Sequence, residues 1–395
     1  MKMTRRRIVA SLFFSSAIAI GITQCTQDSP SAVDPRGETY AAPATCIQCH
    51  RPVVDGYLQH AHFHSSQEAP DDLQHSPITL HTDTFVFNEN TKVGIEHRSD
   101  GWYQVAHVNG KNVHEERIDL VFGAGESAYT FGFWHDDKLM QHPLNYMVNE
   151  QEWVNSPGFP AEQIYFGRTI VTRCLECHSS FVQSYKVSTG PLQMEETFDK
   201  SSLLLGIDCQ RCHGPAAEHV QFHQAHPDAE EPHAMVRFGE LSRIQKMDAC
   251  GICHSGTGVL NFSDAFFFKP GDTLHYFPEY SDFIDRDPDV HGKQKQLLEA
   301  SQCYLLSDLD CTTCHSSHTE EVATLASYSQ KCIQCHQQVD HTAITGNAVL
   351  QDNCIDCHMP IRESKVIGFQ RSEGLGTAPY KQRTHRIAVY LSELE

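Results

Sequence analysis

The sequence predicts a fold of mainly short α-helices and loops around a repeated ligand motif, with one antiparallel β-rich insertion. A Cys-x-x-Cys-His motif occurs seven times, and the longest stretch without a motif is rich in β-branched and aromatic residues. Of the 395 residues, 40% are hydrophobic and 20% are charged, which excludes a disordered, collagen-like or polytopic membrane protein. The 16 cysteines and 26 histidines are the unusual counts, and such an excess of metal-binding side chains indicates bound metal.

The chain begins with the features of an export signal. Lys2 and three arginines at positions 5–7 precede an apolar run at 8–22, which is short for a membrane span. We therefore expect residues 1–24 to be a signal peptide and the mature protein to be exported. Cys25 closes the apolar run where a lipoprotein signal places its lipidated cysteine, which predicts a lipid anchor. The alternative is an ordinary signal peptide that is cleaved further along the chain.

The mature chain is strongly acidic. The signal peptide holds four of the 30 basic residues and none of the 50 acidic ones, so 26 basic residues remain and the net charge is −24. This charge argues against a nucleic-acid partner. An acidic surface suits docking to basic patches on other proteins, although it is equally typical of a solvated surface without a partner.

Fourteen of the 16 cysteines belong to the seven motifs. In each motif two thiols lie three residues apart and a histidine follows the second thiol directly. The cysteines are Cys46, Cys49, Cys174, Cys177, Cys209, Cys212, Cys250, Cys253, Cys311, Cys314, Cys332, Cys335, Cys354 and Cys357. The histidines are His50, His178, His213, His254, His315, His336 and His358.

This pattern has the chemistry of c-type haem attachment. Two thiols add to the two vinyl groups of one porphyrin, and the adjoining histidine binds the iron. Zinc ribbons, iron–sulfur clusters and redox dithiols also use Cys-x-x-Cys, but none of them requires the following histidine. Seven such histidines would arise by chance with a probability on the order of 10⁻⁸ to 10⁻⁹. The sequence therefore predicts seven covalently attached haem c groups.

Seven haems shape the expected architecture. Shared among about 370 mature residues, they replace much of the apolar core that the chain would otherwise need. We predict a multihaem cytochrome in which mainly short α-helices and loops surround seven c-type haems. Residues 25–77 form an N-terminal segment with the first haem motif, 78–155 form the β-rich insertion, and 156–395 form a six-haem cytochrome domain.

The insertion contains a series of strand candidates, and Asn109-Gly110 supplies a hairpin turn between two of them. The C-terminal run at 383–391 is apolar enough to pack back onto the haem domain. The strand candidates are 84–87, 93–96, 102–108, 118–122, 129–134, 139–141 and 144–148.

The second axial ligand of each iron decides whether a haem only carries electrons or can bind a substrate. His318 follows His315 by three residues, which extend to about 11 Å. Two histidines on opposite sides of one iron need Cα atoms about 12 Å apart. If His318 is a ligand, it therefore serves a different haem. For His219, six residues after His213, a helical path is too short for a shared haem and an extended path is not.

Other histidines near motifs or in motif-like contexts are further ligand candidates, whereas most of the remaining ones are expected to be structural or surface residues. The further candidates are His62 (or its neighbours His60 and His64), His291 and His385. The histidines expected to have no ligand role are His81, His142 and His341.

Cys303 is the one cysteine besides Cys25 that lies outside the motifs, eight residues before Cys311. A thiolate bound to a haem iron would lower the reduction potential of that haem. The simpler interpretation is a buried free thiol, which is the more frequent state of an unpaired cysteine.

Seven segments carry a family resemblance that covers nearly the whole mature chain. They are 57–62, 122–127, 153–159, 212–215 with His219, 289–292, 314–318 and 357–360. On these segments the chain resembles multihaem cytochromes of the cytochrome c-552/4 type, related to the tetrahaem cytochrome of ammonia oxidisers, hydroxylamine oxidoreductase and pentahaem nitrite reductase. In this family a histidine shortly after a motif commonly binds a neighbouring haem, which agrees with the argument for His318. The resemblance also implies His62, rather than His60, as the ligand of the first segment.

The sequence departs from that family where catalysis is concerned. The nitrite reductases mark their catalytic haem with lysine in place of the motif histidine, and every motif here ends in histidine. We therefore assign no catalytic residue. The expected function is electron transfer between a quinol-linked donor and a periplasmic or outer-membrane acceptor, in the periplasm or at a lipid-anchored position.

Two alternatives remain open. The first is an oxidoreductase that acts on a nitrogen or sulfur oxyanion, or on hydroxylamine, at one haem with an open distal face. The second is a haem-bearing structural subunit of a larger respiratory complex. An iron bound by two histidines has no vacant position, which favours the electron carrier.

Overall fold

The computed structural model describes residues 33–70, 84–256, 259–260, 265–276, 288–319, 324–338 and 353–390. Within these ranges no helix has the length and apolar character that crossing a bilayer requires. The predicted signal peptide lies outside the described residues, as do Cys25, His81 and His341.

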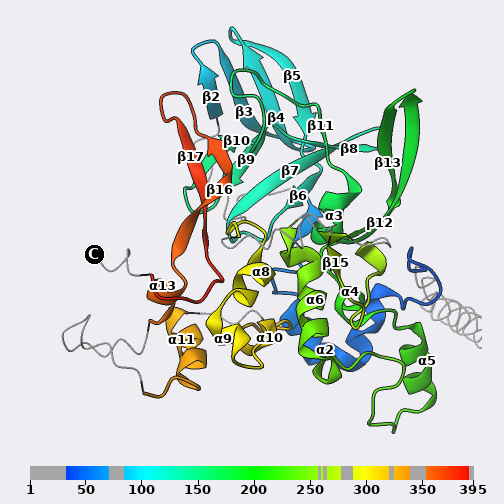
Figure 1. The fold of residues 1–395 in the computed structure, drawn as a ribbon. Coiled ribbons are helices and arrows are strands. Elements are labelled where there is room, and N and C mark those ends of the chain that lie inside the picture. The colour runs from blue at the N-terminus through cyan, green and yellow to red at the C-terminus, as the bar shows by residue number, and fades with distance from the viewer. Residues whose placement is uncertain are drawn as a thin grey trace, which may run out of the picture.

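The prediction of a mainly helical fold is wrong. Strands hold 32% of the described residues and helices 26%, and the strands form several antiparallel sheets. The sequence argument assumed that haems would replace most of the apolar core. Instead the insertion and two later hairpins build sheets with cores of their own, and the short helices gather on one side of them (Figure 1).

A four-stranded antiparallel sheet follows the chain order. In its last turn Asn109 and Gly110 have φ values of 52° and 74°, as the predicted hairpin requires. The final strand was not predicted, because its side chains are polar and exposed. The four strands are β2 (Thr84–Asn88), β3 (Thr91–Arg98), β4 (Gly101–Val108) and β5 (Lys111–Arg117).

The larger sheet has nine strands and joins distant parts of the chain. Its order is β1-β6-β7-β9-β10-β16-β17, and β8 pairs with both β7 and β11. Asn155 pairs with Gln370, so the C-terminal hairpin extends the sheet of the insertion. The strands are β1 (Ser66–Glu68), β6 (Leu120–Phe122), β7 (Ala128–His135), β8 (Lys138–Gln141), β9 (Leu144–Met147), β10 (Glu152–Asn155), β11 (Arg168–Thr169), β16 (Ile361–Gln370) and β17 (Thr377–Arg383).

The two sheets pack face to face around an aromatic core. Phe85 and Trp102 of the smaller sheet meet Phe131, Tyr146 and Trp153 of the larger one. Each of these side chains is at most 3% exposed, and burying one contributes about 1.5–3 kcal/mol. His142 lies fully buried beside this core with its Nε2 3.1 Å from the Arg117 carbonyl, as expected of a structural histidine.

A long hairpin leaves the body next to the second motif. It consists of β12 (Ser179–Gly190) and β13 (Gln193–Leu205), and Figure 1 shows it projecting beside the larger sheet. At its base Phe181 and Phe198 pack with Leu175 and Phe266 in a second apolar core. The sequence did not predict this hairpin, because most of its strand positions beyond the base are exposed and polar.

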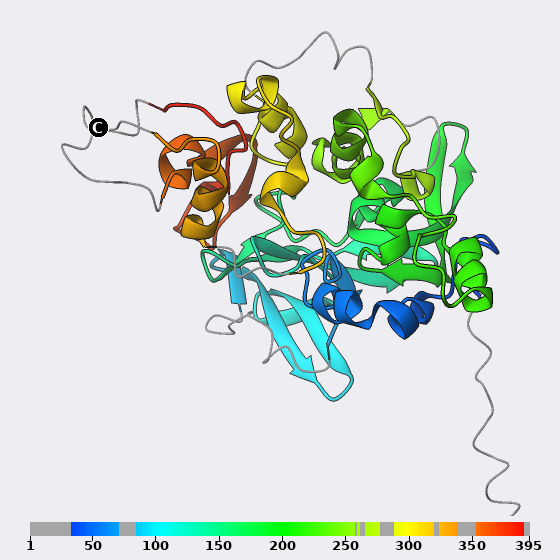
Figure 2. The same ribbon diagram turned by 90° about the horizontal axis from the view of Figure 1, so that it is seen from below.

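Short helices and turns carry the motifs, as predicted. They form a row in which α5 and α13 lie at opposite ends (Figures 1 and 2). The helices are α2 (Ile47–Tyr57), α3 (Thr172–His178), α4 (Cys209–His213), α5 (Ala217–Ala225), α6 (Arg243–His254), α8 (Gln294–Glu299), α9 (Gln302–Leu305), α10 (Cys311–Cys314), α11 (Leu325–Ile333) and α13 (Ile355–His358). The remaining elements are η1 (Pro43–Thr45), η3 (Phe238–Glu240), η5 (Ala265–Phe267), β14 (Val259–Leu260) and β15 (His275–Tyr276).

The C-terminal run packs back onto these helices, which confirms that expectation for its described part. The Ile387 amide donates to the Ser301 hydroxyl at 2.8 Å, and the Ala388 amide donates to the His358 carbonyl at 3.1 Å. Ile387 also packs against Met247 and Leu298.

A buried ion pair fixes the N-terminal segment to the third motif. The guanidinium of Arg36 donates to Asp34 at 2.8 Å and to Asp208 at 2.5 Å, and the Arg36 side chain is fully buried. Burial lowers the pKa of Arg36, but the hydrogen bonds to the two carboxylates outweigh this effect and raise it. Asp208 in turn caps α4 by accepting from the Arg211 amide at 3.0 Å.

We predict that Arg36→Ala lowers the free energy of unfolding by about 3 kcal/mol, because it leaves two carboxylates without their counter-charge. Lys381→Ala is the control, since Lys381 pairs with Glu363 at 3.4 Å on the exposed surface and should change stability by less than about 0.5 kcal/mol. Urea denaturation of the haem-loaded protein measures both. Equal effects of the two substitutions would contradict the assignment.

Candidate haem sites

The local sequence fixes where several motif helices begin. Asp310 accepts from the Thr312 amide at 2.8 Å and starts α10, and Ser242 forms a capping box with Gln245 at the start of α6. These caps satisfy amides that a short helix would otherwise leave free. The capped motif helices therefore begin at defined residues.

The motif helices form a connected series. Helix α3 contacts α6, α6 contacts α10, α10 contacts α11, and α11 contacts α13. The first and third motifs are joined separately, through hydrogen bonds between the Ala41 backbone and the Gln210 side chain at 2.9 Å. The Tyr57 hydroxyl adds a hydrogen bond to the Ile207 carbonyl at 2.6 Å.

Cysteines of different motifs touch one another in three places. A hydrogen bond with Cys209 lowers the pKa of Cys46 to about 7 and raises that of Cys209. In the second pair the same kind of contact raises the pKa of Cys177 and lowers that of Cys253. In the third pair it raises the pKa of Cys250 and lowers that of Cys311. Because each sulfur belongs to a different attachment site, these contacts bring neighbouring haem positions side by side.

Electrostatic interactions between further thiols relate other motifs. Cys212 acts electrostatically on Cys250, which relates the third motif to the fourth. Burial, together with the nearby Cys354 and Cys314, raises the pKa of Cys332 to about 11, which relates the sixth motif to the seventh and the fifth.

Four motif histidines face a second imidazole from a distant segment. Because a metal–imidazole bond is about 2 Å long, two imidazoles on opposite sides of one iron have ring centroids about 6 Å apart. The four observed centroid distances agree with this spacing, so the residues fit a haem iron with two axial histidines. The pairs are His50–His219 at 6.2 Å, His62–His254 at 6.1 Å, His213–His318 at 5.8 Å and His315–His385 at 6.2 Å.

Most of these imidazoles are held in the neutral form that binds metal. Burial, together with neighbouring histidines, lowers the pKa of His62 and of His385 to about 4. Burial also lowers the pKa of His213, His254 and His315. A neutral ring can place a nitrogen lone pair on the iron without losing a proton first.

The pairing distinguishes the histidines that sequence reasoning left open. His62 faces a motif histidine, whereas His60 bonds to the Ser316 carbonyl at 3.1 Å and His64 to the Leu58 carbonyl at 2.9 Å. His318 faces His213 and not the histidine of its own motif.

His178 of the second motif has a different environment. Within the described residues the ring that contacts it is Phe122, at 6.1 Å and nearly perpendicular. Its Nδ1 lies 3.4 Å from the Ser65 carbonyl, and burial lowers its pKa. The sequence gave no sign of this arrangement, because it arises from the pairing of Ser66 with Phe122 between β1 and β6.

The remaining candidates lie apart from the four pairs. Nδ1 of His358 is 2.9 Å from the Ala388 carbonyl, and His336 is exposed at the end of the described segment 324–338. The ring of His291 contacts Tyr380 at 5.4 Å rather than a motif histidine. Cys303 is half-buried, and burial raises the pKa of its thiol.

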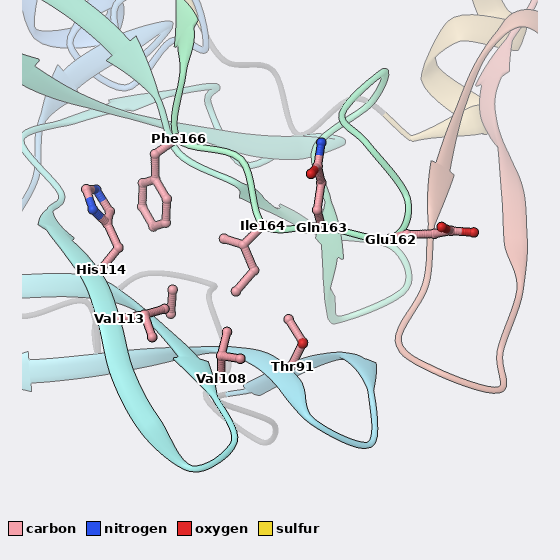
Figure 3. Close-up of a pocket in the computed structure, with 9 residues that line it drawn as sticks. Thr91, Val108, Val113, His114, Glu162, Gln163, Ile164 and Phe166 are labelled. Carbon is pink, nitrogen blue, oxygen red and sulfur yellow. The ribbon is translucent and has the colours of Figure 1, made fainter.

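A cavity of about 430 Å³ opens in the sheet region and holds no motif residue (Figure 3). It lies between the β2–β5 sheet and the segment 162–166, and its walls are mostly apolar. The lining residues are Thr91, Ala106, Val108, Val113, His114, Glu162, Gln163, Ile164 and Phe166.

Comparison with known proteins finds one informative likeness. No family model and no curated protein matches the chain. The fold is similar to the crystal structure of the outer cell wall cytochrome OcwA, with a TM-score of 0.53 and 15% sequence identity over 90% of this chain and 81% of that one. At this identity the likeness is one of fold.

We predict that His318→Met changes the axial ligand of the haem attached at Cys209 and Cys212, and leaves the haem of its own motif unchanged. The reason is the 5.8 Å separation of His318 from His213. Near-infrared magnetic circular dichroism of the oxidised protein detects the conversion of one bis-histidine site to a histidine–methionine site. His60→Ala is the matched control and should convert none; unchanged spectra in His318→Met would contradict the pairing.

Proposed function

We propose that this chain is an exported heptahaem c-type cytochrome that carries electrons between respiratory redox partners through closely packed haems. The four histidine pairs at 5.8–6.2 Å carry the proposal, because each combines a motif histidine with an imidazole at the distance of a second axial ligand. When bound, haem supplies the one-electron iron couple; the protein supplies ligands, spacing and a dry environment.

The contacts between motifs suggest an electron route. Sulfur contacts and packed helices link the first motif to the third, and the fourth to the fifth, sixth and seventh. Arg211 of the third motif donates to the Glu176 carbonyl, whose oxygen also lies 3.9 Å from the Cys253 sulfur of the fourth. The second motif branches from the fourth through Cys177 and Cys253. A series of adjacent sites with α5 at one end and α13 at the other supports a carrier that accepts electrons at one end and releases them at the other.

The ligand pairs also support the carrier over a catalyst. An iron bound by two histidines has no vacant position for a substrate. At these four sites the chain would therefore exchange electrons without binding a small molecule.

The second motif supports a second candidate function. Its histidine meets Phe122, and a phenyl ring cannot bind iron. An open face at this haem would suit an oxidoreductase that acts on a nitrogen or sulfur oxyanion or on hydroxylamine. We also propose that the chain is related to multihaem cytochromes of the cytochrome c-552/4 type. That relationship is compatible with either function.

Location and partners follow from the charge and the N-terminal signal. We propose a position in the periplasm or a lipid-anchored position outside the cytoplasmic membrane, with a quinol-linked donor and a periplasmic or outer-membrane acceptor. A net charge of −24 after removal of the signal peptide suits partners with basic docking surfaces. The fold likeness to an outer cell wall cytochrome supports a location outside the cytoplasm.

The haem count tests the proposed function. Intact-mass spectrometry of the exported protein should show seven covalent haems, since each of seven Cys-x-x-Cys-His motifs attaches one. Replacing Cys332 and Cys335 together by alanine should remove one haem. A protein without covalent haem, or the same count in both proteins, would refute the proposal.

For the second candidate, we predict that the oxidised protein has one high-spin haem that Phe122→His converts to low spin, because the new imidazole would face His178. Phe122→Leu is the control and should keep the high-spin signal. Cyanide titration followed by optical spectroscopy reports the same site. If cyanide binds no haem in the unmodified protein, this candidate function fails.

A further inference from the structure

Arg211 is a buried cation within the third motif. It is 9% exposed, and its guanidinium lies 5.5 Å from the centre of the Phe266 ring. Nη1 donates to the Ala265 carbonyl at 2.6 Å, and Nη2 donates to the Glu176 carbonyl at 2.7 Å. Both of these partners are neutral.

Within the described residues Arg211 has no carboxylate partner at ion-pair distance. The nearby carboxylates of Asp34 and Asp208 both bind Arg36, and the carboxylate of Glu176 binds Arg173 at 2.6 Å. Two carbonyl dipoles therefore compensate the charge in direct contact. Burying a charge without an opposite charge costs free energy, so its presence calls for a reason other than stability.

The position of this cation supplies the reason. Glu176, whose carbonyl it binds, belongs to the second motif, and Arg211 itself to the third. The sulfur of Cys253, in the fourth motif, lies 3.9 Å from that same carbonyl oxygen. The guanidinium thus sits at the junction of three candidate haem sites, where the second motif branches from the series.

We propose that Arg211 sets the reduction potentials of the haems at this junction. Reduction of a ferric haem adds one electron and moves no atom, so a fixed positive charge nearby stabilises the reduced state. Compared with a neutral side chain, the cation raises the reduction potentials of the haems at this junction. Electrons in the series therefore occupy these haems preferentially. This inference rests on the proposed haem-binding function.

Redox titration of the complete haem-loaded protein, followed optically with mediators, tests the inference. Arg211→Gln should lower the equilibrium constant for reduction of at least one haem about tenfold, which equals about 59 mV for one electron. Arg211→Lys keeps the charge and should stay close to the unmodified protein. Arg98→Gln is the matched control, because Arg98 pairs with Glu96 and Glu115 in the smaller sheet and should change no potential.

Each outcome decides one claim. Unchanged potentials in an Arg211→Gln protein with a full haem complement would overturn the inference and leave the proposed function standing. An equal shift in Arg211→Lys would overturn it in favour of a structural role. If Arg211→Gln fails to load haem, Arg211→Met repeats the test with another neutral side chain. If both neutral variants fail to load haem while Arg211→Lys loads it, the inference is also overturned. An unmodified protein without covalent haem would refute the proposed function itself.

Discussion

In the proposed function the arrangement of the helical half depends on one constraint: at four motifs a haem iron would take a second ligand on the face opposite the motif histidine. The partner imidazole comes from far along the chain in all four pairs; His62, for example, lies opposite His254 and His385 opposite His315. Helices such as α5 bury none of their own residues, and α5 nevertheless carries His219 to its place opposite His50. In this account ligation takes over the cross-linking that side-chain packing performs in an ordinary helical protein, and the helical half gains its stability when haem is bound.

The sheets form the part of the structure that does not depend on haem ligation. The aromatic core between them is complete without any motif residue, and it gives the short helices a rigid surface to rest on. The pairing of Asn155 with Gln370 brings the hairpin that follows the seventh motif into the same sheet as the insertion. The two ends of the motif series are therefore attached to the larger sheet, the first through β1, which follows α2, and the last through β16, which follows α13.

Sequence patterns identified the strands of the insertion and the seven motifs, because both signals are local. Hydrophobic alternation and an Asn-Gly turn predicted β2 to β4 and the strands from β6 to β9, whereas the polar strand β5 and the exposed hairpin β12–β13 have no such pattern. The predicted fold class was wrong. We expected haems to replace most of the apolar core, whereas the sheets form apolar cores of their own. Chain reach showed that His318 could not serve the haem of its own motif. It did not show that His213 would face His318, because that pairing joins segments about a hundred residues apart. The buried charge of Arg211 was likewise hidden in a variable motif position.

The central claim is that motif histidines and distant imidazoles form bis-histidine iron sites joined in a series. Spin-quantified low-temperature electron paramagnetic resonance of the fully oxidised protein tests it most directly, because low-spin ferric haems with two imidazole ligands give signals distinct from high-spin ones. The account predicts at least four low-spin haems per molecule, one for each histidine pair, none of which changes when nitrite, hydroxylamine or cyanide is added. Fewer than four low-spin haems, or small ligands that displace several of them, would contradict it.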